Sequence, residues 1–119
     1  MTYTCLIVPL PPSDNNLFPG KARRYVSHAY ASWRSEAHAM LLQQSPLPRY
    51  EGPVVVTLSH GRPSKRRMDV HNRVKAIPDL LQEHGVLIDD SQIECLTVQW
   101  ARGVVGSRIE IEPVEGVNG

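Results

Sequence analysis

Residues 54–85 read VVVTLSHGRPSKRRMDVHNRVKAIPDLLQEHG, and this stretch decides the fold class. Its first five residues are apolar or β-branched, which predicts a buried strand over 54–58. A basic loop over 61–67 follows that strand. From Asp69 onward, apolar residues recur at spacings of four, three and four, at Val70, Val74, Ile77 and Leu81. This spacing predicts a helix with one buried stripe, so the stretch encodes a strand followed by a helix.

Two residues shape the predicted helix. Pro78 lacks the N–H that would bond to the Val74 carbonyl, so we expect a kink or a break there. Gly85 follows the stripe and can adopt the left-handed conformation that ends many helices. The helix is therefore expected to begin near Asp69 and to end before Gly85.

The sequence on both sides of this stretch predicts four further elements. Residues 4–8 form an apolar run typical of a strand, and Ser27 is placed to cap a helix. The stripe of that helix consists of Tyr30, Trp33, Ala37, Met40 and Leu41. Alternating residues predict strands over 96–100 and 108–112, joined by a hairpin turn over 103–106. We predict one α/β (α+β) domain over 1–119, ordered β-α-β-α-β-β, with a mixed sheet packed by two helices and a frayed tail over 116–119.

Length and composition exclude several classes of protein. The chain has 119 residues, enough for one small domain. Its apolar runs are far shorter than the ~20 residues that span a bilayer, and its start lacks the basic residues of a secretory signal. Cys5 and Cys95 lie in apolar, strand-like sequence, so we expect two buried free thiols in a reducing cytoplasm. No glycine-rich phosphate loop is present, so we expect no small-molecule cofactor.

The charge is divided unevenly along the chain. Residues 1–75 hold 11 Lys and Arg against 4 Asp and Glu, a net +7, whereas residues 76–119 hold 2 against 8, a net −6. Six of the thirteen cations fall within fourteen residues: Arg62, Lys65, Arg66, Arg67, Arg73 and Lys75. Such a cluster suits a phosphate backbone, although a solvated loop would have the same composition.

The same region carries groups that could cleave a phosphodiester. Asp69 and His71 precede the predicted helix, and Asp90 follows it. Carboxylates bind hard divalent cations, and such an ion can activate water. Asp69 and His71 can converge only if Asp69 sits at the helix N-cap, whereas His71 and Lys75 would share a helical face. The alternative is that Asp69 is a simple N-cap and that Asp90 belongs to a turn.

The chain resembles the RusA family of Holliday junction resolvases, which are small dimeric endonucleases often encoded by prophages. The resemblance runs over nearly the full length. Its N-terminal part comprises the early strand, residues 11–16 (PPSDNN) and the helix entry at 24–27 (RYVS). Its most specific part comprises residues 66–75, RRMDVHNRVK, followed at 85–93 by GVLIDDSQI. The family has basic residues, D-x-D-N, a lysine three residues later, and then a glycine, an apolar run and D-D-x-Q.

The resemblance implies roles for individual residues. Asp69 and Asp90 take the places of catalytic aspartates, and Lys75 that of the active-site lysine. His71 stands where the family has its second aspartate. The implied catalytic set is thus Asp69, His71, Lys75 and Asp90, with Asp69, His71 and Asp90 as metal ligands. The implied DNA-binding residues are Arg23, Arg24, Lys65, Arg66, Arg67, Asn72 and Arg73.

His71 leaves two alternatives open. An imidazole suits Mn²⁺ better than Mg²⁺ and removes one negative charge from the site. Either cleavage of four-way DNA junctions survives with an altered metal preference, or the protein binds junctions without cutting them efficiently. In both cases we expect a homodimer, because a junction offers two symmetric strands. We expect Mg²⁺, or Mn²⁺, as the cofactor, and the cytoplasm of a bacterial or phage-infected cell as the location.

Overall fold

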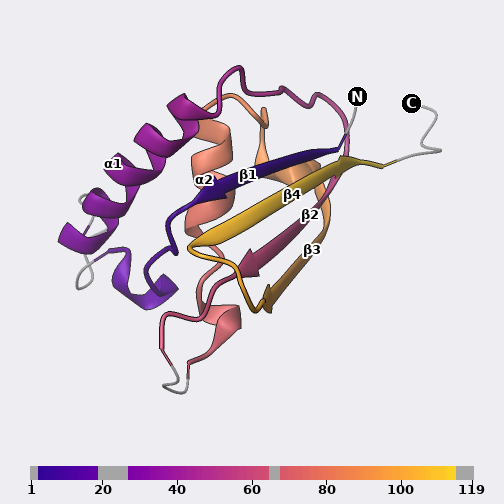
Figure 1. Ribbon diagram of the computed structural model, residues 1–119. Coiled ribbons are helices and arrows are strands. Elements are labelled where there is room, and N and C mark those ends of the chain that lie inside the picture. The colour runs from indigo at the N-terminus through magenta and orange to yellow at the C-terminus, as the bar shows by residue number, and fades with distance from the viewer. Residues whose placement is uncertain (1–2, 19–26, 65–67, 115–119) are drawn as a thin grey trace.

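Four strands form one mixed sheet in the computed structural model of the chain, which describes residues 3–18, 27–64 and 68–114 (Figure 1). The strands are β1 (Thr4–Val8), β2 (Val54–His60), β3 (Ile93–Trp100) and β4 (Ser107–Pro113). Their order across the sheet is β1-β4-β2-β3. β4 runs antiparallel to both of its neighbours, and β2 and β3 are parallel. The predicted mixed sheet and the α+β class are confirmed.

Both α-helices lie on the same side of this sheet (Figure 1). They are α1 (His28–Gln43) and α2 (Ala76–Glu83). The Ser27 hydroxyl accepts the Tyr30 N–H and so caps α1, as predicted. Four of the five residues of the predicted stripe are buried: Tyr30, Trp33, Ala37 and Leu41. The alternate residues of the central strands complete one apolar core between helices and sheet, at Val54, Val56, Leu58, Ile109 and Ile111.

The prediction of two buried thiols is wrong. Cys5 and Cys95 are free, but both are exposed. Cys5 precedes the buried Leu6, so the alternation of a strand turns it to the face that the helices leave uncovered. Cys95 lies on β3, which is an edge strand with mostly exposed residues. Apolar sequence context alone does not show which face of a sheet is covered.

The predicted hairpin between the last two strands is also wrong. A turn does connect β3 to β4, with positive φ at Gly103 and Gly106. The two strands are not neighbours, however, because β2 lies between them and pairs with both. A Cβ on Gly106 would lie 2.5 Å from the Val8 carbonyl oxygen, so this connection passes close to the end of β1. A side chain cannot be accommodated there.

The second helix begins later than predicted. Residues Val70–Asn72 form a short 3₁₀ turn, η2, and α2 starts only at Ala76. Pro78 therefore lies in the first turn of α2, where its missing N–H has no intrahelical partner to lose. The expected break thus lies upstream of Pro78, and His71 and Lys75 do not share a helical face. Gly85 has a φ of 73°, in agreement with its predicted position after the helix.

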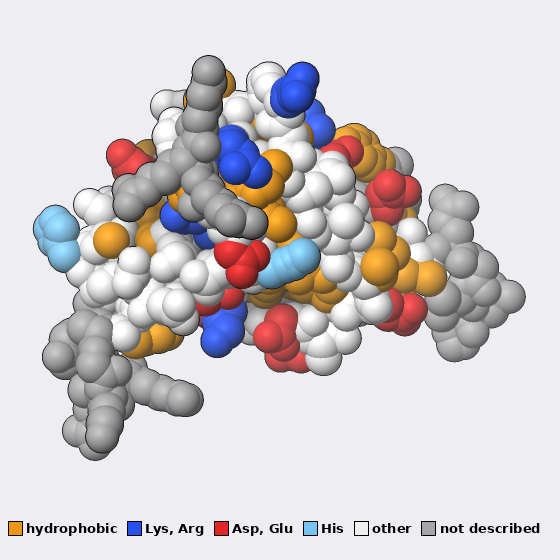
Figure 2. Space-filling view, turned by 90° about the horizontal axis from the view of Figure 1, so that it is seen from below, with side chains coloured by type: hydrophobic (Ala, Val, Ile, Leu, Met, Phe, Trp, Pro, Cys, Tyr) orange, Lys and Arg blue, Asp and Glu red, His pale blue; other side chains and the backbone are white. Residues whose placement is uncertain are grey.

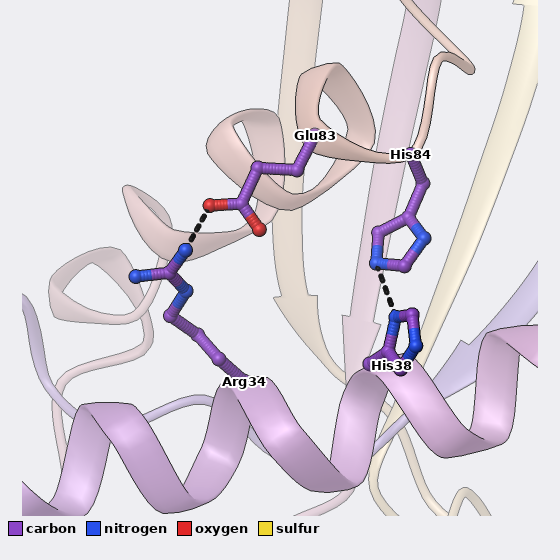
Figure 3. Close-up of polar contacts among 4 residues, drawn as sticks. All are labelled: Arg34, His38, Glu83 and His84. Atoms are coloured by element: carbon purple, nitrogen blue, oxygen red, sulfur yellow. Dashed lines mark hydrogen bonds and ion pairs between the residues drawn. The ribbon is translucent and has the colours of Figure 1, made fainter.

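Two side-chain pairs join α1 to α2 (Figure 3). Arg34 forms an ion pair with Glu83, and His38 Nδ1 lies 3.5 Å from His84 Nε2. Burial, and then the neighbouring His38, lower the pKa of His84.

In the described part of the chain, no helix combines the length and hydropathy needed to cross a bilayer.

Candidate active site

The segment between β2 and α2 carries three of the four predicted catalytic residues. Asp69 caps η2, because its Oδ1 accepts the His71 N–H at 2.9 Å. This N-cap position is the one that the sequence required for Asp69 to approach His71. The side chains of Asp69, His71 and Lys75 are all exposed. The segment therefore presents a carboxylate, an imidazole and an ammonium group to solvent.

His60 fixes this segment to the end of β2. Its ring is fully buried, with Nε2 2.8 Å from the Arg73 carbonyl oxygen and Nδ1 2.7 Å from the Ser107 hydroxyl. A carbonyl oxygen can only accept, so Nε2 carries the proton and Nδ1 accepts from Ser107. Burial lowers the pKa of His60, which favours this neutral form. The sequence does not single out His60, because its partners lie 13 and 47 residues away along the chain.

Asp14 fixes the same segment from a second direction. It begins the 3₁₀ turn η1 (Asp14–Asn16), and its Oδ1 accepts the N–H groups of Val74 at 3.1 Å and Lys75 at 3.0 Å. The neighbouring Pro11 carbonyl accepts a hydrogen bond from Arg73 Nη1 at 2.6 Å. Asp14 thus sets the position of the Lys75 backbone. The sequence placed Asp14 in a turn, but gave no indication of a partner 60 residues away.

Asp90 lies in a different part of the molecule. It begins the 3₁₀ turn η3 (Asp90–Gln92), which Asp89 caps through the Ser91 N–H. Hydrogen bonds from the Ser91 side chain and from its N–H lower the pKa of Asp89. The Asp90 N–H donates to Gln82 Oε1 at 2.9 Å. Gln92 Nε2 donates to the carbonyls of residues 50 and 52, just before β2. Asp90 therefore precedes β3, at the amino end of the parallel strand pair.

A second carboxylate lies within the electrostatic reach of Asp90. Burial raises the pKa of Asp79, on α2, and the negative charges of Asp90 and Glu83 raise it further. Repulsion of this kind is relieved when a cation binds. Asp79 was not a predicted site residue, because a single acidic residue on a helix carries no signal in the sequence.

The predicted metal ligands are not gathered within one chain. Asp69 and His71 lie beyond the carboxyl end of β2, whereas Asp90 lies near its amino end. A seven-residue strand is on the order of 20 Å long. Among the described residues, no three His, Cys, Asp or Glu side chains lie together in a way that could hold a metal ion. The carboxylates are suitable ligands for a hard cation, but their placement within a single chain does not fit one.

The predicted DNA-binding residues divide into two groups. Asn72 and Arg73 are partly buried beside η2, and Arg73 uses one of its donors on Pro11. The others lie outside the described residues: Arg23, Arg24, Lys65, Arg66 and Arg67. Figure 2 shows the face at the carboxyl ends of β2 and β3, where acidic, basic and histidine side chains lie close together.

Comparison with known proteins adds an independent observation. The family model described as Endodeoxyribonuclease RusA matches residues 9–112. Crossover junction endodeoxyribonuclease RusA of Escherichia coli (strain K12) is 28% identical over 116 residues, which cover 96% of this chain and 95% of that protein. The protein of the same name from Shigella sonnei (strain Ss046) is 26% identical over 115 residues, with the same coverage. The match to the family model spans the segment from Asp69 to Asp90.

Proposed function

The chain belongs to the RusA endodeoxyribonuclease family, and on this premise we propose that it is a Holliday junction resolvase. Its substrate is DNA at a four-way junction formed during recombination or repair, and its reaction is hydrolysis of a phosphodiester. The observation that carries the proposal is the family match over residues 9–112, which includes the exposed group of Asp69, His71 and Lys75. We place this activity in the cytoplasm of a bacterial or phage-infected cell.

The residues of the segment before α2 have distinct roles in this proposal. The ammonium group of Lys75 stabilises negative charge that develops on the phosphoryl oxygens. Asn72 and Arg73 contact the DNA backbone, together with the basic residues at 23–24 and 65–67. His60 and Asp14 touch no substrate in this scheme. They act as positioning residues, because they hold the backbone of the segment at Arg73 and at Lys75.

A divalent cation, Mg²⁺ or Mn²⁺, completes the proposal. When bound, it would activate water and neutralise charge on the scissile phosphate. We assign its ligands to Asp69, His71 and Asp90. Since one chain keeps Asp90 apart from the other two, we propose a twofold homodimer in which Asp90 of one subunit approaches Asp69 and His71 of the other. Twofold symmetry also gives two equivalent sites for the two strands of a junction.

The test is nicking of a synthetic four-way junction, with a linear duplex of the same sequence as the control substrate. We expect nicking of the junction only, faster in Mn²⁺ than in Mg²⁺, because an imidazole suits the softer ion. Asp90→Asn should lower the rate by about 100-fold or more, since a ligand carboxylate is lost. His71→Asp should raise the rate in Mg²⁺, because it restores a hard, negatively charged ligand.

His71 favours one second candidate, a junction-binding protein that cuts poorly or not at all. This candidate predicts binding of the junction without nicking in either metal, and a gain of nicking in His71→Asp. If neither the natural protein nor His71→Asp nicks the junction, the proposed catalytic set is wrong. If neither binds the junction, both candidate functions fail.

A further inference from the structure

We propose that Trp100, Arg62 and Arg102 form a subsite for an unstacked DNA base and its phosphates, separate from the proposed catalytic set. The inference rests on the proposed function only in naming DNA as the ligand. These three residues line a cavity of about 670 Å³ together with residues 101, 103 and 104. The cavity lies where β3 ends and its connection to β4 begins.

The lining of this cavity combines a flat aromatic surface with positive charge. The guanidinium carbon of Arg62 lies 4.8 Å from the centroid of the Trp100 ring, within the range of a cation–π contact. Both arginines are exposed, and the indole is partly exposed. Nucleic-acid bases stack on indole rings and on guanidinium planes, and arginines attract the flanking phosphates. Among the described residues, no acidic side chain lines the cavity, so its described lining does not oppose a polyanion.

Trp100 is held rigidly, as a stacking platform requires. Its ring packs against the buried His60 ring, with centroids 6.1 Å apart and an interplanar angle of 62°. The next residue, Ala101, donates its N–H to the His60 carbonyl at 2.8 Å. Trp33 makes a useful contrast, because it is 4% exposed and donates its indole N–H to the Pro9 carbonyl. Trp33 is a core residue, whereas Trp100 offers an indole surface beside solvent.

The subsite lies next to the candidate active site. His60 is paired with Trp100 in the parallel ladder, and the same His60 ring bonds to the Arg73 carbonyl. A DNA strand could therefore pass from the η2 segment to Trp100 across the ends of two adjacent strands. Stacking requires an exposed base face, which a continuous duplex does not provide but a single strand, or the opened centre of a junction, does. The subsite would thus favour DNA with unpaired bases.

The test measures the affinity of the full chain for a single-stranded thymidine oligonucleotide in EDTA, so that no cleavage occurs. Tryptophan fluorescence reports stacking, and the anisotropy of a labelled oligonucleotide reports binding. We expect the oligonucleotide to quench the fluorescence. Trp100→Leu should abolish the quenching and weaken binding by about 5-fold to 150-fold, the range that stacking of one base accounts for. Trp100→Phe keeps an aromatic face and should bind within about fivefold of the natural protein.

Two further variants separate stacking from charge. Arg102→Gln should reduce the slope of log affinity against log salt by about 0.7, the loss of one phosphate contact to a single strand. Val105→Ala is the matched control on the same connection, because Val105 is 90% exposed and does not line the cavity. It should leave quenching and affinity unchanged.

Two results would overturn the inference. One is equal affinity of the natural protein and of a folded Trp100→Leu, as judged by its thermal unfolding. The other is quenching that persists in Trp100→Leu and so originates from Trp33. Junction nicking is measured in parallel with Mg²⁺ and Mn²⁺. If quenching depends on Trp100 but no nicking occurs, the subsite is supported and the proposed cleavage fails. If the junction is nicked but quenching does not depend on Trp100, the proposed cleavage is supported and the subsite fails.

Discussion

His60 links the stability of the fold to pH at the scale of a single residue. Burial lowers its pKa in the folded chain below the ordinary value of about 6.5, which the unfolded chain retains. Below that value the unfolded state binds more protons, so the free energy of unfolding falls as the pH falls. Each such group contributes a slope of at most about 1.4 kcal/mol per pH unit. Unfolding by urea between pH 5 and pH 8 measures this slope.

The contribution of His60 can be separated from that of His84, whose pKa is also lowered. His60→Gln keeps a donor for the Arg73 carbonyl but cannot titrate, so its stability should depend less on pH. His84→Gln serves as the comparison, because His84 is only partly buried and should contribute the smaller share. A pH dependence that is identical in the natural protein and in His60→Gln would show that His60 is not the main titrating group.

Some residues of the candidate site could be predicted from the sequence, and others could not. The motif around Asp69 predicted an N-cap and a catalytic segment, because capping depends on the next few residues. The exposed thiols and the anchoring roles of His60 and Asp14 were not predicted. They depend on which face of the sheet is covered and on partners 13 to 61 residues away. Such information lies in the fold and not in local spacing.

At the scale of elements, the sequence patterns correctly predicted the features that depend only on residues close together in the sequence. The stripe and the cap of α1 lie within one segment, and both were predicted. β3 lies beside β2 and not beside β4. This arrangement depends on the connection between β3 and β4, which crosses β2. The start of α2 was misplaced because η2 interrupts the apolar stripe, and because Asp14 accepts the N–H groups that precede the helix. The order of elements was thus predictable, whereas strand neighbours and the start of α2 were not.

Asp14 should connect the stability of α2 to activity. Asp14→Ala removes the acceptor of the Val74 and Lys75 N–H groups, so we expect a loss of about 1–3 kcal/mol in the free energy of unfolding. It should also slow junction nicking, because the Lys75 backbone loses its anchor. Asp14→Asn is the matched control, since its side-chain oxygen can accept both hydrogen bonds. If Asp14→Asn is as impaired as Asp14→Ala, the negative charge matters and the anchor does not explain the effect.

At the scale of the whole molecule, any proposed function must account for the separation of the three proposed metal ligands. Asp69 and His71 lie near the carboxyl ends of β2 and β3, and Asp90 lies near the amino ends. In the described part of one chain, no set of three potential ligands is assembled. The proposed twofold dimer would reconcile this separation with the proposed metal-dependent cleavage, because it can place opposite ends of two chains together.

Mixed dimers test this arrangement directly. Asp69→Asn and Asp90→Asn should each be inactive alone, since every site in either homodimer lacks one carboxylate. In a heterodimer of the two variants, one shared site would lack both carboxylates and the other would be intact. After free exchange of subunits in an equal mixture, about a quarter of the sites should be active, so junction nicking should return to about a quarter of the natural rate. If each site belonged to one chain, every site in the heterodimer would carry a substitution and the mixture would stay inactive. Sedimentation of the mixture establishes that dimers are present, so that an inactive mixture counts against shared sites.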